Sequence, residues 1–359
     1  MAEASRDKTS VGKRIQQLVN RTIKRNVNGV SYFLTPNPPV GLSKHDIIHK
    51  RGPMQVFHYH ALTDEVYKTP VLIVSPTTNR SYCLDMMPGV SLVEYLLKAG
   101  YDVFLLDWQP PRPEDKNLAL QDFSQTFVAE AISAAKRATG EDEVTLIGYC
   151  MGGVLSTIYT ASYDNESVRN LVCFTTPVDW SKMGMFAKTT DKKHFDVDRL
   201  VDSIGNIPPN LVLQCFMAVD PGSKPASQIT LWRIMWNEDW VEYFRKYDRW
   251  AIDMLPLTGE YFRETIKDLM WDNALYTGKL MVGGRSANPK NITVPFFHAQ
   301  AKHDSLIPPD ASRPLIDLVG SEDKTEMVLS GGHVSLVCGP NAVGRLWPQL
   351  DDWLSERSA

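Results

Sequence analysis

The chain has 359 residues, of which 43% are hydrophobic and 22% are charged, and its formal net charge is −4. These values are ordinary for a globular protein with a full core, and the weakly acidic balance argues against nucleic acid as a partner. The sequence shows neither a signal-peptide pattern nor an apolar run of about 20 residues, so we expect no membrane span.

Five cysteines are present, and no two of them have the C-x-x-C spacing of a metal site. An odd number of cysteines without such pairs predicts free thiols, no bound metal and a reducing, cytoplasmic environment.

The N-terminal segment, residues 1–30, contains a predicted basic amphipathic helix over residues 11–27. Apolar residues recur there at helical spacing, with lysines and arginines between them. Such a helix docks either on its own domain or on a partner subunit or apolar surface. The apolar positions are Val11, Ile15, Leu18, Val19 and Ile23, and the basic ones are Lys13, Arg14, Arg21, Lys24 and Arg25.

A β-hairpin is predicted over residues 44–62, turning at Arg51–Gly52–Pro53. Short strands then alternate with helices, and these strands are apolar throughout rather than at every second position. This pattern predicts a mostly parallel sheet with both faces covered. The predicted strands span residues 69–76, 101–108, 143–150, 168–180, 291–304 and 325–333, and the predicted helices span 91–100, 123–140 and 342–357.

The alternation of strands and helices is interrupted over residues 181–290. We expect this stretch to form a helical cap inserted into a core made of residues 31–180 and 291–359. It holds five of the nine tryptophans. Trp232, Trp236 and Trp240 are four residues apart, so we expect them on one helical face, either packed in the core of the cap or lining a substrate channel.

The segment GYCMGG, residues 148–153, has the spacing of a nucleophile elbow, G-x-S-x-G, with Cys150 in the nucleophile position. It lies between a predicted buried strand and a predicted helix, which is the setting found in the α/β-hydrolase fold. Gly148 and Gly152 would relieve clashes in this sharp turn, and Gly153 would let the helix pack closely on the sheet. Cys150 would lie at a helix N-terminus, where the dipole favours a thiolate. The alternative is a buried structural cysteine.

A thiolate nucleophile needs a base, and the base needs a group that orients it. In the α/β-hydrolase fold the chain order is nucleophile, acid, histidine. Asp304 and His333 each follow a predicted strand in that order, so we expect them to complete a triad with Cys150. His303 is the best rival for a supporting role, and His298, in the middle of a strand, is expected to be buried.

The oxyanion that develops during acyl transfer needs backbone N–H donors. One donor is expected from Met151, directly after the nucleophile. The other is expected from the loop after strand 69–76, around Thr78 and Asn79. The alternative for that loop is ordinary turn chemistry.

A cysteine nucleophile suits acyl transfer from thioesters, because passing the acyl group between thiols is nearly isoenergetic and keeps it activated for an alcohol. The sequence resembles the catalytic subunit of poly(3-hydroxyalkanoate) synthases, which polymerise hydroxyacyl-CoA into storage polyester. The resemblance extends over residues 69–336. The matching stretches are SPTTNRSYCLD (75–85), DVFLLDW (102–108), GYCMGG (148–153), HDSLIPPD (303–310) and GGHVSL (331–336).

The resemblance implies that Cys150 is acylated, that His333 deprotonates the thiol, and that Asp304 supports His333 or helps to activate the incoming hydroxyl. It implies an (R)-3-hydroxyacyl-CoA substrate, with 3-hydroxybutyryl-CoA expected, CoA as a product and no bound cofactor. Two positions depart from the family pattern: Ser305 stands where a histidine is frequent, and Thr78 stands where an apolar residue is frequent.

The short chain is similar to the catalytic subunits of two-subunit synthases. The expected partners are therefore a small second subunit, a second copy of the chain in a homodimer, the growing polyester and the surface of its cytoplasmic granule.

Two other functions stay open. A cysteine hydrolase of the dienelactone hydrolase or thioesterase type would release free acid, and the large predicted cap disfavours it. A non-catalytic scaffold on the granule would leave Cys150 unreactive, and the intact triad disfavours that.

Overall fold

The computed structural model describes residues 2–163, 165–219 and 223–358. The chain divides into two compact units, one made of Met1–Val40 and Pro221–Ile252 and the other of Gly41–Asp220 and Asp253–Ala359. The range predicted as a cap, 181–290, contributes to both units. No helix in the described ranges is both long enough and apolar enough to cross a membrane.

The larger unit is built on an eight-stranded sheet with the order β1-β2-β4-β3-β5-β6-β9-β10. The hairpin of β1 and β2 is antiparallel and turns at Gly52, whose φ is 53°. From β4 to β10 every neighbouring pair is parallel, which confirms the predicted mostly parallel sheet. The strands are β1 (His45–Arg51), β2 (Met54–Tyr59), β3 (Val71–Val74), β4 (Val103–Trp108), β5 (Val144–Tyr149), β6 (Val168–Phe174), β9 (Phe296–Ala301) and β10 (Lys324–Leu329).

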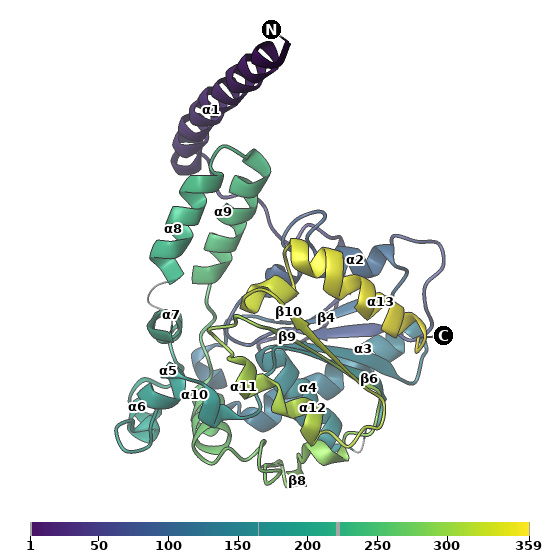
Figure 1. The fold of residues 1–359 in the computed structure, drawn as a ribbon. Coiled ribbons are helices and arrows are strands. Elements are labelled where there is room, and N and C mark those ends of the chain that lie inside the picture. Colours follow the sequence, from purple (N-terminus) through teal and green to yellow (C-terminus); the bar gives the residue numbers. More distant parts are fainter. Residues whose placement is uncertain (1, 164, 220–222, 359) are drawn as a thin grey trace. The chain divides into compact units, whose positions relative to one another are not determined.

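The inner strands β3, β4, β5 and β9 are buried along their whole length, because helices cover both faces of the sheet. Figure 1 shows α2 and α13 on one face and α4 on the other. Two predicted helices begin with a π-helical turn, η3 before α3 and η8 before α13. The bounds are α2 (Leu92–Lys98), η3 (Asp122–Phe127), α3 (Val128–Thr139), α4 (Met151–Ser162), η8 (Ala342–Leu346) and α13 (Trp347–Ser355).

Several short elements of the larger unit lie between β6 and the end of β10. Five helices among them contribute side chains to the pocket described below, in addition to the 3-10 turn that starts at Trp180, and we call these five the pocket helices. They are α5 (Met185–Thr189), α6 (Val197–Ile204), α7 (Pro209–Val219), α10 (Gly259–Glu264) and η5 (Thr265–Trp271). The remaining elements are β7 (Met281–Val282), β8 (Arg285–Ser286), α11 (Pro309–Ser312), α12 (Pro314–Leu318) and the short 3-10 turns.

The smaller unit consists of α1 (Ala2–Leu34), α8 (Ser223–Ile234) and α9 (Glu238–Ile252). The helix predicted over residues 11–27 is therefore present, and it is longer than predicted. The Asn28 side chain is buried and donates a hydrogen bond of 2.7 Å to the carbonyl oxygen of Met235. The buried core of this unit is Leu231, Met235, Val241 and Phe244, with Tyr32 and Ile234 packed against it.

The prediction that three tryptophans share one helical face is wrong, because the helix breaks between them. α8 ends at Ile234, and Asn237 starts a new helix by accepting hydrogen bonds from the backbone of Val241 and Trp240. Trp232 is 56% exposed and Trp240 is 41% exposed, so neither packs in a core.

The rings of Trp232 and Trp236 instead receive the guanidinium groups of Arg25 and Arg21, at 5.4 and 4.4 Å from the ring centroids. These tryptophans therefore hold α1 against α8 by cation–π contacts.

Candidate active site

The nucleophile elbow lies between β5 and α4, as predicted. Cys150 has φ 54° and ψ −120°, a conformation that costs energy for any residue other than glycine. The turn is held by a hydrogen bond of 2.9 Å from the Cys150 N–H to the carbonyl oxygen of Phe174, at the end of the neighbouring strand β6. The Cys150 side chain is nearly enclosed, with 6% of the residue exposed.

The three glycines of the elbow are required by close backbone approaches. A Cβ on Gly148 would lie 2.4 Å from the Cα of Gly153, and one on Gly152 would lie 2.0 Å from the carbonyl oxygen of Val74. A Cβ on Gly153 would lie 1.8 Å from Oγ1 of Thr176. No side chain fits at these distances, so the elbow packs this tightly only with glycine at all three positions.

Asp304 and His333 lie beyond the carboxyl ends of β9 and β10, close to each other. Nδ1 of His333 is 2.8 Å from Oδ2 of Asp304, and the side chain of Asp304 is fully buried. The carboxylate also accepts hydrogen bonds from the Thr175 hydroxyl at 2.5 Å and from the backbone N–H groups of Leu306 and Ile307 at 3.0 and 2.8 Å. Asp304 is therefore fixed from three directions while it holds one nitrogen of the imidazole.

The electrostatics couple the three side chains. Burial alone would lower the pKa of His333, but the Asp304 carboxylate and, after it, the Cys150 side chain beside the ring raise it to about 10. Burial alone would raise the pKa of Asp304, but the His333 charge and the hydrogen bonds to the carboxylate hold it below its usual value. The buried carboxylate of Asp304 therefore favours the charged form of the imidazole.

The rival histidines lie elsewhere. The side chain of His303 is exposed, and its backbone N–H bonds to Gly331 at 2.9 Å, which joins the loops that carry Asp304 and His333. His298 is fully buried in β9, as predicted, and burial lowers its pKa to about 4. Tyr149 packs against His333, with the two rings tilted by 35° and their centroids 5.1 Å apart.

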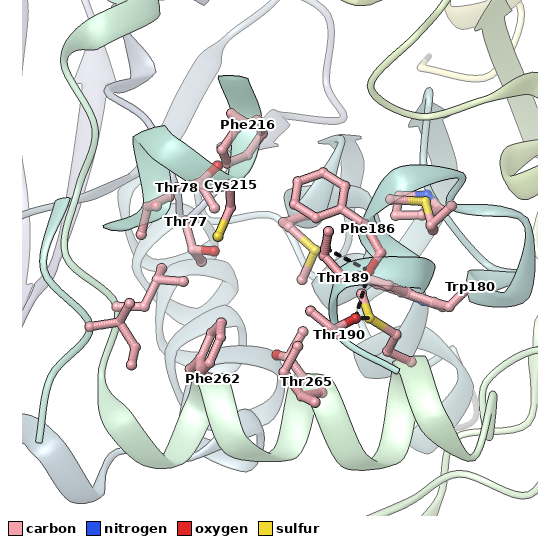
Figure 2. A pocket seen from close by; sticks show the side chains of 18 of the residues that line it. Thr77, Thr78, Trp180, Phe186, Thr189, Thr190, Cys215, Phe216, Phe262 and Thr265 are labelled. Carbon is pink, nitrogen blue, oxygen red and sulfur yellow. Dashed lines mark hydrogen bonds between the residues drawn. The ribbon is translucent and has the colours of Figure 1, made fainter. Parts of the chain in front are cut away.

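An apolar pocket of about 290 Å³ opens beside Cys150. Residues that follow the strands supply one wall, and the pocket helices and the loops between them supply the rest with aromatic, aliphatic and methionine side chains (Figure 2). Such a lining suits an alkyl or ester chain better than a charged group. The apolar residues include Met183, Phe186, Leu211, Phe216, Leu257 and Met270.

The residues predicted for the oxyanion site are partly brought together. Met151 and Thr78 line the pocket with Cys150, and Met151 occupies the first turn of α4, where backbone N–H groups have no partner inside the helix. Asn79 is buried and pairs with Met254 in an isolated β-bridge, outside the residues that line the pocket. Thr77 lines the pocket in its place.

Several residues of the site were missed from the sequence. Thr175 directly follows β6, and a polar residue at the end of an apolar strand was the signal that could have identified it. Trp180 lines the pocket from the loop after β6, and Tyr261 does so from α10. No sequence pattern identifies these two, because their contacts with the pocket are long-range. In the described part of the chain no group of three or more His, Cys, Asp or Glu side chains could hold a metal ion.

The elbow, the order of its partners and the parallel sheet define the class, which is the α/β-hydrolase fold. The family described as "alpha/beta hydrolase fold" matches residues 82–340. A soluble variant of monoglyceride lipase from Saccharomyces cerevisiae aligns with a TM-score of 0.56 over 90% of this chain and 100% of its own, at 16% identity. A monoacylglycerol lipase from Paleococcus ferrophilus aligns at 0.54 over 84% of this chain and 99% of its own, at 17% identity. These structures share the fold alone.

Comparison with known sequences identifies a more specific family within this fold class. The family described as "Poly-beta-hydroxybutyrate polymerase (PhaC) N-terminus" matches residues 33–96. Poly(3-hydroxyalkanoate) polymerase subunit PhaC of Haloferax mediterranei is 32% identical over 89% of this chain, which spans 65% of that protein. The protein of the same name from Allochromatium vinosum is 32% identical over 88% of this chain and 90% of its own length. The chain belongs to the poly(3-hydroxyalkanoate) polymerase family.

Proposed function

We propose that the protein polymerises (R)-3-hydroxyacyl-CoA into polyester and releases CoA through a thioester on Cys150. The observation that carries the proposal is the hydrogen-bonded pair of His333 and Asp304 together with Cys150, which lies beside His333 and lines an apolar pocket. Family membership supports the substrate class, with 3-hydroxybutyryl-CoA as the expected monomer. No cofactor is proposed, because CoA enters with the substrate and leaves as a product.

In the first step Cys150 is acylated. His333 takes the thiol proton, and the sulfur attacks the carbonyl carbon of the acyl-CoA thioester. The tetrahedral intermediate then expels the CoA sulfur, which leaves as a thiol with the proton from His333. Asp304 orients the imidazole and stabilises its charged form throughout, because it binds Nδ1 and leaves Nε2 for the thiol.

In the second step the acyl group moves to the chain end. His333 takes the proton of the terminal hydroxyl, and the hydroxyl oxygen attacks the acyl carbonyl carbon of the Cys150 thioester. The carbon–sulfur bond breaks, the thiol regains its proton from His333, and the polyester is one unit longer. We propose that the N–H of Met151 and a donor from residues 77–79 bind the oxyanion in both steps.

Two alternatives lead to different products. A cysteine hydrolase of the dienelactone hydrolase or thioesterase type would pass the acyl group to water and release free 3-hydroxy acid. A non-catalytic scaffold would form no thioester on Cys150. The coupled triad and the family membership favour the polymerase over both.

The first experiment measures CoA release from 3-hydroxybutyryl-CoA and tests the product for insoluble polyester. Wild type and Cys150→Ala are each assayed with and without a candidate small second subunit. Polymer from wild type and none from Cys150→Ala supports the proposal. Release of CoA with only free acid would replace it by the hydrolase, and an unreactive wild type under every condition would favour the scaffold.

We propose that α1 carries the contact for a small second synthase subunit. A row of its apolar side chains is more than half exposed, and the basic residues of the helix lie between them. A homodimer contact and attachment to the surface of a cytoplasmic granule are the competing uses of this row. The exposed residues are Ile15, Leu18, Val19, Ile23, Val27 and Val30.

This contact is tested by deleting residues 1–28 and, separately, by the double variant Leu18→Asp and Ile23→Asp. Loss of co-purification with the second subunit, while the isolated chain keeps its own oligomeric state, supports the contact. Lys13→Gln is the matched control on the polar face. Unchanged binding in both variants would refute it, and a change of oligomeric state alone would assign the row to a homodimer.

A further inference from the structure

The pocket beside Cys150 has few polar groups, and half of its hydroxyl groups already donate a hydrogen bond to an acceptor in the protein. Three of the six hydroxyl-bearing residues that line it donate their protons to acceptors within the protein. These are Thr78 to Oδ1 of Asn79 at 3.2 Å, Thr189 to the carbonyl oxygen of Met185 at 3.0 Å, and Thr190 to that of Phe186 at 2.7 Å. The other three are Thr77, Tyr261 and Thr265.

Thr77 and Tyr261 form a buried hydroxyl pair. Their oxygens are 3.1 Å apart, and the two residues are 3% and 1% exposed. Two hydroxyls carry two protons, and the bond between them uses one, so one O–H remains as a donor whichever residue donates. Burial raises the pKa of Tyr261 well above its usual value, which keeps the phenol neutral and able to donate.

A third hydroxyl, that of Thr265, lies next to this pair. Thr265 begins η5, which directly follows the helix α10 that carries Tyr261. Its hydroxyl lies beside that of Tyr261 and, among the described residues, has no hydrogen-bond partner of normal geometry. Figure 2 shows Thr265 pointing from its helix toward the pocket, with Thr77 on another wall. A buried hydroxyl without a partner is uncommon in a folded protein and marks a place where a ligand group completes the bonding.

Both members of the pair line the same pocket as the Cys150 thiol. In a 3-hydroxyacyl thioester the hydroxyl carbon is only two bonds from the carbonyl carbon that Cys150 attacks. We infer that the Thr77–Tyr261 pair, with Thr265 beside it, binds this 3-hydroxyl and so selects (R)-3-hydroxyacyl groups over acyl groups that lack it. This inference rests on the proposed function.

One other donor in the pocket is unpaired among the described residues, the indole N–H of Trp180. It belongs to the loop after β6 and has no neighbouring hydroxyl partner, so it provides a single donor without the second oxygen that a hydroxyl ligand also needs. The hydroxyl pair offers both a proton and lone pairs, which matches a ligand hydroxyl on both counts.

The test is single-turnover acylation of Cys150 in the full-length protein, with any second subunit found to be required. The acyl donors are (R)-3-hydroxybutyryl-CoA, its (S) enantiomer and butyryl-CoA, and acyl-Cys150 is quantified by mass spectrometry. Tyr261→Phe should slow acylation by the (R) donor about 10-fold and leave butyryl transfer nearly unchanged. Tyr159→Phe, a buried tyrosine outside the pocket lining, is the matched control, and thermal melting verifies folding.

The possible outcomes are distinct. Equal loss for the (R) donor and butyryl-CoA, or a wild type that accepts both equally, would overturn the inference and leave the polymerase proposal intact. A selective loss in Trp180→Phe, with none in Tyr261→Phe, would transfer the recognition to Trp180. A wild type that acylates Cys150 with none of the donors would contradict the proposed function itself.

Discussion

The two sides of the pocket are built in different ways. On the strand side, Cys150, Asp304 and His333 follow strands of one parallel sheet, and each is fixed by hydrogen bonds or by backbone contacts that exclude any Cβ. On the other side, the pocket helices are short, and their contribution is mostly apolar contact. The strand side therefore tolerates little displacement, whereas the helical side can change its shape by exchanging one apolar side chain for another.

The two sides of the pocket suit two different tasks, the chemical step and the binding of the acyl group. Bond making needs atoms held within a fraction of an ångström, and sheets with buried polar networks provide that rigidity. Acceptance of acyl groups needs volume and apolar surface, which many packings supply. Substitutions on the strand side should reduce rate or folding sharply, and those on the helical side should shift preference mildly.

The largest effect is expected from Asp304→Asn. The amide keeps the shape of the carboxylate but cannot stabilise the imidazolium, so CoA release should fall about 10³- to 10⁴-fold. Asp310→Asn, an exposed carboxylate nearby in the chain, is the control and should retain activity. Comparable rates in the two variants would mean that Asp304 is not the orienting acid.

The second largest effect is expected on the free energy of unfolding, at Gly152 of the elbow. Gly152→Ala places a methyl group 2.0 Å from a backbone oxygen, which cannot move without disturbing β3. Its free energy of unfolding should drop by about 3 kcal/mol or more, measured by urea titration. Gly344→Ala meets nothing within 4 Å and should stay near wild type. If both variants unfold alike, the elbow is looser than its contacts indicate.

The pH dependence of the unfolding free energy tests the coupling between His333 and Asp304 on the strand side. The pKa of His333 is raised from 6.5 to about 10 in the folded protein, so its interactions stabilise the fold fully below pH 6.5 and lose that effect as the pH rises toward 10. The difference in unfolding free energy between wild type and His333→Gln should therefore narrow over that interval. The lowered pKa of Asp304 acts oppositely, with stability lost only as the pH falls through the acidic range. A constant difference from pH 6.5 to 10 would refute the coupling.

The smallest effect is expected on the helical side. Phe186 packs edge-to-face on Phe216, with centroids 5.5 Å apart, and both line the pocket. Phe186→Leu should raise the rate with 3-hydroxyhexanoyl-CoA relative to 3-hydroxybutyryl-CoA by up to about 10-fold, since one added cavity accepts a longer alkyl group. Phe57→Leu, in the hairpin, should leave the ratio unchanged. No change in either variant would place the alkyl group elsewhere in the pocket.

The strand side could be predicted from the sequence, because its signals are local. Buried parallel strands are continuous apolar runs such as VLIV and VFLLDW, and Cys150 stands just after a strand of this kind. Asp304 and His333 stand in the loops that follow β9 and β10. The spacing of the elbow glycines reflects contacts within a single turn.

The helical side and the smaller unit depend on contacts between distant residues. The pairing of Thr77 with Tyr261 joins positions 184 residues apart, and no periodicity reveals it. The break between α8 and α9 did have a signal, because Asn237 followed by Glu238 and Asp239 is typical of a helix start. The regular spacing of the tryptophans obscured that signal.

The glycines of the elbow also have a consequence for protein engineering. Cys150 takes its strained conformation from Gly148, Gly152 and Gly153 and from a backbone bond to Phe174, none of which involves sulfur. Another small nucleophile can therefore replace Cys150 without further changes to the turn. A Cys150→Ser protein should keep the conformation of the elbow, while its nucleophile changes from a thiol to a hydroxyl.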